Sequence, residues 1–161
     1  MPVALLALGS NMGDRAGHLR RAVEDLRRLD PALSLSSVYE TEPVGGPPQG
    51  RYLNCVARLE TDLTPEELLA RAMALEEAAG RVRTAPNGPR TLDVDLLVVG
   101  DETRDTASLT LPHPRMVERA FVLAPLEEVA PLLVPQGWRE RLGGKVQVEA
   151  QVRKVGNLCC G

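Results

Sequence analysis

Residues 91–99 place the tightest constraint on the fold, because they combine the apolar pattern of a buried strand with two carboxylates two positions apart. Successive side chains of a strand point to opposite faces of a sheet. Asp93 and Asp95 therefore share one face, while the Leu and Val residues that alternate with them point to the other. Two like charges about 7 Å apart on an apolar strand repel each other unless a cation binds between them. The pattern predicts a strand with its acidic face at a binding site.

A magnesium ion suits this carboxylate pair. Mg²⁺ prefers oxygen ligands, takes one or two carboxylates and completes its shell with water and phosphate oxygens. The sequence before the strand carries Arg81, Arg83 and Arg90, whose guanidinium groups can bind phosphate oxygens through paired hydrogen bonds. Together these residues indicate a polyphosphate site with Mg²⁺. The alternative is an exposed acidic pair beside solvated arginines, which a D-x-D motif alone would favour but this combination does not.

Length and composition indicate one globular domain over residues 1–161. The chain is 43% apolar and 25% charged, and its net charge of -3 argues against general nucleic-acid binding. The three cysteines provide neither a disulfide framework nor a zinc site, which predicts a reducing, cytoplasmic compartment. The sequence shows no signal-peptide or membrane-spanning pattern, so we expect no membrane partner.

Hydrophobic periodicity predicts two strand-helix-strand units. The expected strands are 2–8, 33–40, 52–61 and 91–99, and the expected helices are 14–29 and 64–80. The second helix has the clearest start, because Thr64-Pro65-Glu66-Glu67 is a capping box with proline at the first helical position. This order predicts a ferredoxin-like α+β fold, with an antiparallel sheet, helices packed on one face and additional C-terminal helix and strand elements.

The rest of the chain has weaker patterns. Residues 41–50 are rich in Gly and Pro, and a loop of this kind could line a pocket. We expect a short strand at 109–112 and a helix over 116–129 that is interrupted at Pro125. The glycine-rich segment 9–14 lacks the Lys-Ser/Thr of a P-loop, so a structural turn is favoured over a phosphate loop. The C-terminal part shows no chemical motif.

The sheet face opposite the helices is the predicted active site. Tyr52 and Asn54 alternate onto this face, as Asp93 and Asp95 do. Tyr52 is one of four aromatic residues and could stack on a ligand, although ordinary packing would also explain it. Glu76, near the end of the second helix, could accept hydrogen bonds from a ligand hydroxyl.

Five motifs resemble the 6-hydroxymethyl-7,8-dihydropterin pyrophosphokinase family, and the resemblance spans most of the chain. Each motif is weak alone, but the five in order are specific. They are Ala7-Leu8-Gly9-Ser10-Asn11, Tyr52-Leu53-Asn54, Gly80-Arg81-Val82-Arg83, Gly88-Pro89-Arg90-Thr91-Leu92-Asp93-Val94-Asp95, and Pro112-His113 with Arg119-Ala120-Phe121. The resemblance implies transfer of the β,γ-pyrophosphoryl group of ATP to the hydroxymethyl oxygen of the pterin, with release of AMP.

The resemblance also implies roles for individual residues. Asp93 and Asp95 would hold two Mg²⁺ ions that bridge the phosphates of ATP. The residues implied to bind the nucleotide are Glu76, Arg81, Arg83, Arg90, His113 and Arg119, with Arg81 and Arg90 also catalytic. The residues implied to bind the pterin are Thr41, Pro43, Val44, Tyr52, Asn54 and Phe121. Tyr52 and Phe121 would cover the two ring faces, and Asn54 would pair with the polar ring edge.

Two positions depart from the family pattern. The loop around Pro86-Asn87 lacks an aromatic residue that is common in the family and is one residue shorter. Pro114 follows His113 where an aromatic residue often stands. These departures concern loop closure and the tightness of ligand binding rather than the chemistry.

Two rival functions are compatible with paired acids on such a sheet. A two-metal nucleotidyltransferase or nuclease would use the same carboxylates, but the acidic pI of about 5.5 and the lack of a basic groove disfavour it. A non-catalytic ferredoxin-like ligand-binding domain would explain the fold but not the arginines near the carboxylates. We therefore expect a monomeric enzyme whose partners are ATP and a hydroxymethyl-dihydropterin.

Overall fold

The computed structural model describes residues 1–43, 48–80 and 91–158. Its strands are β1 (Val3–Ser10), β2 (Ser34–Leu35), β3 (Val38–Thr41), β4 (Tyr52–Glu60), β5 (Asp93–Val99), β6 (Arg104–Asp105), β7 (Thr110–Leu111) and β8 (Val152–Gly156). Its helices are α1 (Arg15–Arg27), α2 (Pro65–Ala78), α3 (Ala120–Val129), α4 (Trp138–Arg141) and α5 (Lys145–Gln151), with 3-10 turns η1 (Met116–Glu118) and η2 (Pro131–Leu133). None of the helices in these ranges is long and apolar enough to cross a membrane.

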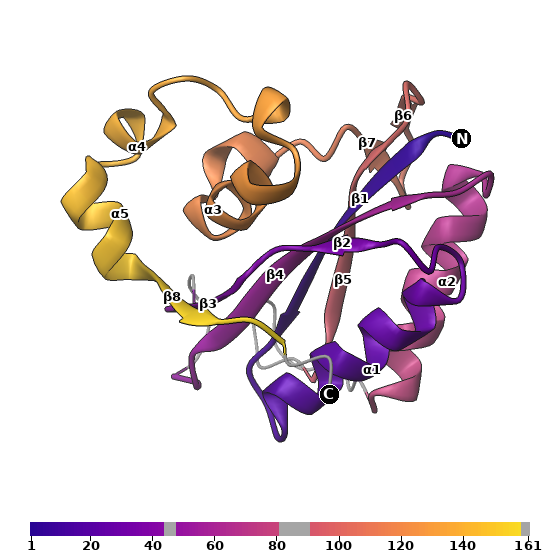
Figure 1. Cartoon of the computed structure of the whole chain (residues 1–161), viewed down its shortest axis with the longest axis horizontal. Coiled ribbons are helices and arrows are strands. Elements are labelled where there is room, and N and C mark those ends of the chain that lie inside the picture. The colour runs from indigo at the N-terminus through magenta and orange to yellow at the C-terminus, as the bar shows by residue number, and fades with distance from the viewer. Residues whose placement is uncertain (44–47, 81–90, 159–161) are drawn as a thin grey trace.

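An antiparallel sheet with the order β5-β1-β4-β3-β8 forms the centre of the molecule, and β2 also pairs with β4. The placement of β1 between β4 and β5, with α1 and α2 as connections, confirms the predicted ferredoxin-like α+β class (Figure 1). Of the short strand expected at 109–112, residues Thr110 and Leu111 form β7, which pairs with β6. The expected strand at 33–40 is divided into β2 and β3. Ser36 lies in the gap, where its side-chain oxygen accepts a hydrogen bond from the Val56 N–H at 2.9 Å.

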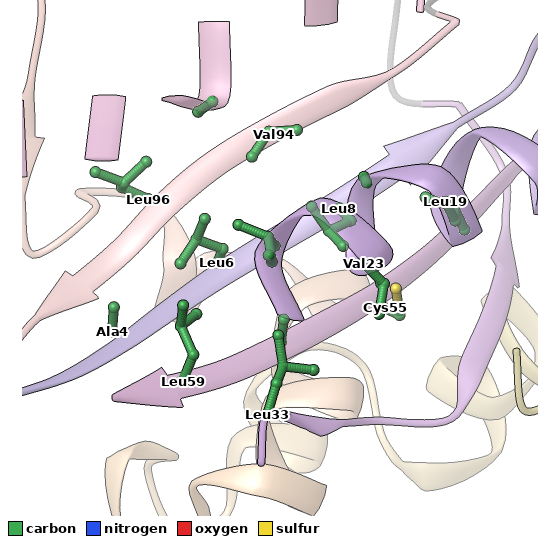
Figure 2. Packing of buried hydrophobic residues seen from close by; sticks show 14 of the residues in the cluster. Ala4, Leu6, Leu8, Leu19, Val23, Leu33, Cys55, Leu59, Val94 and Leu96 are labelled. Atoms are coloured by element: carbon green, nitrogen blue, oxygen red, sulfur yellow. The ribbon is translucent and has the colours of Figure 1, made fainter. Parts of the chain in front are cut away.

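Helices α1 and α2 cover one face of the sheet (Figure 1). The alternating residues of β1, β4 and β5 that face them form the larger apolar core, as Figure 2 shows for Ala4, Leu6, Leu8, Cys55, Leu59, Val94 and Leu96. Both helices begin at a side-chain cap, since Asp14 accepts a hydrogen bond from the Gly17 N–H at 3.1 Å and Thr64 accepts one from the Glu67 N–H at 3.1 Å. The capping box predicted for α2 is confirmed.

Helices α3, α4 and α5 lie on the opposite face (Figure 1). Buried residues of the sheet and of α3 form a second core there, which includes Leu5, Val56, Leu97, Val122, Leu123 and Leu126. Trp138 of α4 and Val148 of α5 extend this core. The sheet is therefore covered on both faces, by α1 and α2 on one side and by α3 to α5 on the other.

The helix expected over 116–129 is interrupted at a different residue from the one predicted. Arg119 has extended backbone angles and separates η1 from α3, whereas Pro125 lies inside α3. A proline inside a helix costs about 3 kcal/mol, partly because it lacks the N–H that donates to the preceding turn. Residues 122–126 are all buried, and burial of this apolar face offsets that cost. The prediction of a break at Pro125 is wrong.

The C-terminal segment is more regular than its sequence pattern indicated. Val146 and Val148 both lie in α5. The strand follows directly as β8, which pairs with β3 and extends the main sheet. The expected additional helix and strand elements are therefore present, and they reach the sheet face that carries the site.

Candidate active site

One row of residues crosses β5, β1 and β4 on the face away from α1 and α2. Gly9 of β1 is opposite Asp93 of β5 on one side and opposite Asn54 of β4 on the other. Neighbouring strands are about 4.8 Å apart, so the backbones of Asp93 and Asn54 lie about 10 Å apart with only Gly9 between them. A Cβ atom on Gly9 would come within 2.8 Å of Asn54 Oδ1. This row therefore requires a residue without a side chain at its centre.

Asp93 and Asp95 are half-buried at the start of β5 and share a face, as their alternation predicted. The β1 residues opposite them are Gly9 and Ala7, so no long side chain of β1 covers the carboxylates. Across residues 1–43, 48–80 and 91–158 no three or more His, Cys, Asp or Glu side chains form a group that could hold a metal. A carboxylate pair with small neighbours fits Mg²⁺, which fills its other positions with water and phosphate oxygens.

A cavity of about 1060 Å³ lies over this row. It brings together nine of the predicted site residues, namely Thr41, Pro43, Tyr52, Asn54, Asp93, Asp95, His113, Arg119 and Phe121. They come from β3 and the residues just after it, from β4 and β5, and from the segment before α3 together with the start of α3. These parts are distant in the sequence. The volume is at the upper end of the range for small-molecule sites, so two ligands can be accommodated side by side.

One wall of the cavity carries amide and aromatic side chains. Asn54 is buried, and its Nδ2 donates a hydrogen bond to Thr41 Oγ1 at 2.7 Å. This bond fixes the amide, so that Oδ1 lies toward Gly9. Tyr52 is opposite Thr41 in the β3-β4 register, and Phe121 contributes a second half-buried aromatic ring from α3. These groups can stack on a flat heterocycle and pair with its polar edge.

The segment before α3 forms a basic wall. The His113 backbone N–H donates to the Leu97 carbonyl at 2.9 Å, which fastens this segment to β5. Nδ1 of His113 accepts a hydrogen bond from the Arg115 N–H at 3.2 Å. Burial lowers the pKa of His113, and the charges of Arg119 and Arg115 lower it further against the opposing effect of Asp93. A neutral His113 with Nδ1 as acceptor carries its proton on Nε2, from which it can donate to an anion.

Glu76 lies in a different environment from the other predicted site residues. It is 8% exposed on α2, and its Oε2 accepts a hydrogen bond from the Val94 N–H at 2.9 Å. Glu76 is not among the residues that line the cavity, so its contact with a nucleotide stays a prediction. Four further predicted site residues, Val44, Arg81, Arg83 and Arg90, lie outside the described residues, and their roles stay predictions as well.

Comparison with known proteins identifies the family of this chain. The family model described as 7,8-dihydro-6-hydroxymethylpterin-pyrophosphokinase (HPPK) matches residues 5–131. The chain belongs to the HPPK family. A Bacillus subtilis protein named 2-amino-4-hydroxy-6-hydroxymethyldihydropteridine pyrophosphokinase is 46% identical over 129 residues, which are 79% of this chain and 77% of the relative. A protein of the same name from Aquifex aeolicus is 37% identical over 142 residues, or 88% of this chain and 89% of the relative.

Solved structures share the fold. A crystal structure of Plasmodium falciparum HPPK-DHPS covers 96% of this chain with a TM-score of 0.66 at 13% sequence identity. An HPPK-DHPS in complex with substrates covers 98% with a TM-score of 0.61 at 12% identity. The chain spans about half of these longer proteins, 47% and 45%. At such low identity the likeness shows the fold alone, and it agrees with the α+β class found for this HPPK family member.

Several residues that line the HPPK cavity were not predicted from the sequence. Gly9 was assigned to a structural turn, but it lies within β1 at the centre of the site. The pairing of β1 with β5 would have indicated its place, since it puts Gly9 directly opposite Asp93. Arg115 lies two positions from His113 and was passed over. Gln151 and Val152 come from the C-terminal segment, which carries no motif that would have revealed them.

Proposed function

We propose that this chain transfers the β,γ-diphosphate of ATP to the hydroxymethyl oxygen of 6-hydroxymethyl-7,8-dihydropterin in folate biosynthesis and releases AMP. One observation carries the proposal: the Asp93 carboxylate and the Asn54 amide line one cavity on either side of Gly9. A site for phosphate chemistry and a site for a flat polar ring are therefore neighbours. Membership of the HPPK family supports this reaction.

The pterin binds at the β3-β4 side of the cavity. Tyr52 and Phe121 stack on the two faces of the ring, and the Asn54 amide pairs with its polar edge. Backbone groups of Thr41, Pro43 and Val44 complete this part of the site. The buried bond between Asn54 and Thr41 supports the assignment, because it holds the amide in one orientation before the ligand arrives.

ATP binds at the β5 side of the cavity. Asp93 and Asp95 would hold two Mg²⁺ ions, and the residues proposed to bind the nucleotide are Glu76, Arg81, Arg83, Arg90, His113 and Arg119. When bound, Mg²⁺ neutralises phosphate charge and lowers the pKa of the attacking hydroxyl. The protein itself contributes mainly by positioning and charge, since phosphoryl-type transfer needs little covalent chemistry from it.

The reaction exchanges one phosphorus-oxygen bond for another. The pterin oxygen bonds to the β-phosphorus while the bond from the β-phosphorus to the oxygen that bridges to the α-phosphorus breaks. AMP leaves with that bridging oxygen, and the hydroxyl proton passes to water. The guanidinium groups on the phosphate side hold the transferred pair of phosphates rather than a single terminal one.

Analysis of the nucleotide products tests the proposal. The chain is incubated with ATP, Mg²⁺ and the pterin alcohol, and the products are separated by chromatography. We expect AMP and the pterin diphosphate ester in equal amounts, with only a trace of ADP and no turnover in EDTA. ADP as the main product would contradict diphosphate transfer, and an absence of nucleotide consumption would contradict the catalytic function altogether.

We further propose that the enzyme acts as a monomer in the cytoplasm. The low number of cysteines supports a reducing compartment. Light scattering coupled to size-exclusion chromatography would show a single species near 17.4 kDa, and a stable dimer would contradict this part of the proposal.

A further inference from the structure

Arg115 lies in the wall of the same cavity, on the turn that connects His113 to Arg119. Backbone hydrogen bonds define this turn, with the Met116 N–H donating to the His113 carbonyl at 3.3 Å and the Glu118 N–H donating to the Arg115 carbonyl at 3.0 Å. The Arg115 N–H also donates to His113 Nδ1 at 3.2 Å. The backbone of Arg115 is therefore held directly against the imidazole that faces the cavity.

The guanidinium of Arg115 differs from those of other arginines on this side of the molecule. Arg139 forms an ion pair with Glu127 at 3.0 Å, and Arg141 donates to the Val117 carbonyl. Arg119 lies over the ring of Phe121, with 5.5 Å from the guanidinium carbon to the ring centroid. Within residues 1–43, 48–80 and 91–158, no ion pair or hydrogen bond engages the guanidinium of Arg115.

The charge of Arg115 nevertheless acts on the cavity. It is one of the two positive charges that lower the pKa of His113, after the larger effect of burial. The wall thus presents a neutral imidazole Nε2–H beside an arginine whose donors are not used elsewhere in the described chain. A guanidinium fork next to a neutral donor suits the oxygens of a phosphate chain.

We propose that Arg115 is a further nucleotide-binding residue, whose guanidinium binds the β- or γ-phosphate of ATP beside His113. The proposal rests on the proposed function, because it takes ATP as the ligand of this end of the cavity. It adds a phosphate contact from the wall opposite the β4 side, in a position that the sequence motifs did not indicate. Loss of this contact weakens binding of the triphosphate but not of a nucleotide that lacks the two outer phosphates.

Calorimetry with two nucleotides tests this contact. The probes are α,β-methylene-ATP with Mg²⁺, in which the bond to be broken is replaced by a stable one, and AMP. For Arg115→Ala we expect the Kd of the ATP analogue to rise about tenfold, the scale of one charge-assisted hydrogen bond. The Kd of AMP should change less than about threefold. Arg20→Ala is the matched control, since it removes an exposed arginine of α1 far from the cavity lining and should change neither value.

The results separate Arg115 from the function of the whole site. A rise of less than about threefold for the analogue, or an equal rise for AMP, would overturn the role of Arg115. A similar loss in Arg20→Ala would also overturn it, because the effect would then follow from net charge. These binding measurements do not require turnover. The Arg115 contact would therefore stand even if the wild-type chain made ADP instead of AMP. Conversely, the binding results could overturn the role of Arg115 while the wild-type chain forms AMP as proposed.

Discussion

At Gly9 the missing side chain shapes the site. The strand register places Gly9 between Asp93 and Asn54, and the Asn54 amide already fills the space that a Cβ atom would need. Asn54 is held from its other side by Thr41 at 2.7 Å, so it cannot retreat without breaking a buried hydrogen bond. The position of the amide that we propose to bind the pterin is thus determined by one hydrogen bond and by the absence of a Cβ atom on Gly9.

Gly9→Ala should weaken pterin binding about tenfold, because the new methyl group displaces the Asn54 amide from its position. Binding of α,β-methylene-ATP should change little. A double-mutant cycle with Asn54→Ala provides the control, since the methyl group has no amide to displace in that background. Additive losses of pterin affinity in the cycle would show that Gly9 acts on some other part of the site.

Asp93→Asn and Asp95→Asn should each reduce turnover to below about 1% of wild type while leaving the fold intact or more stable. Each change removes one of two neighbouring like charges, whose repulsion the proposed Mg²⁺ ions would relieve. Steady-state kinetics and urea unfolding in EDTA measure the two effects. Activity well above this level in either variant, with normal Mg²⁺ dependence, would contradict the proposal that both carboxylates bind metal.

At the scale of elements, the sequence predicted what local patterns determine. The period of two in 91–99 and the capping box at Thr64 led to β5 and α2 in their observed places. The break at Arg119 and the continuation of α3 through Pro125 depend on burial against the sheet, which local propensity does not contain. The hydrogen bond of Glu76 could not be predicted from local patterns either, because its partner Val94 is 18 residues away on β5. Site residues marked by alternation or by a motif were predicted from the sequence. Site residues whose place depends only on the register between paired strands were missed.

Glu76→Ala should destabilise the fold by about 1 to 3 kcal/mol, because it leaves the buried Val94 N–H without its acceptor. It should also lower kcat, since β5 carries Asp93 and Asp95. Urea unfolding and kinetics measure both, and Glu77→Ala, an exposed neighbour on α2, is the control. A raised KM for ATP without loss of stability would instead support the predicted contact between Glu76 and the nucleotide.

Glu128 connects α3 to β3, and its contribution to the stability of the fold should depend on pH. It accepts hydrogen bonds from the Tyr39 hydroxyl and from the Ser37 N–H. Burial tends to raise the pKa of Glu128, but these bonds and the charge of Lys154 outweigh it and lower the pKa below its ordinary value of 4.5. A lowered folded-state pKa means that the stabilisation is complete above the ordinary pKa and is lost as the pH falls through the lowered one.

The stability advantage of wild type over Glu128→Gln should therefore be constant near neutral pH and shrink below about pH 4.5. Urea unfolding at a series of pH values measures it. Glu149→Gln removes an exposed carboxylate of α5 and serves as control, with a small effect expected at every pH. A constant difference between wild type and Glu128→Gln down to pH 3 would contradict the proposed source of the effect.

At the scale of the whole molecule, the family match ends at residue 131, but residues after 131 also contribute to the sheet and to the lining of the cavity. The chain continues through α4 and α5 to β8, which pairs with β3, the strand that carries Thr41. Strand β3 in turn pairs with β4. Leu142, Gln151 and Val152 of this segment line the cavity. The C-terminal segment therefore joins the second core to the pterin side of the site, so its packing should affect both stability and ligand binding.

Two valines of α5 allow this connection to be tested. Val148 is 2% exposed and belongs to the second core, whereas Val146 on the same helix is 84% exposed, and neither lines the cavity. Val148→Ala should destabilise the fold by about 1 to 3 kcal/mol through the space that it leaves, and Val146→Ala should have almost no effect. Because Gln151 and Val152 follow in the same segment, Val148→Ala should also raise the KM for the pterin more than the KM for ATP.

Urea unfolding and steady-state kinetics on both variants test this prediction. A loss of stability with an unchanged KM for the pterin would mean that α5 supports the fold without shaping the site. Equal behaviour of the two variants would mean that α5 is not packed on the sheet as described.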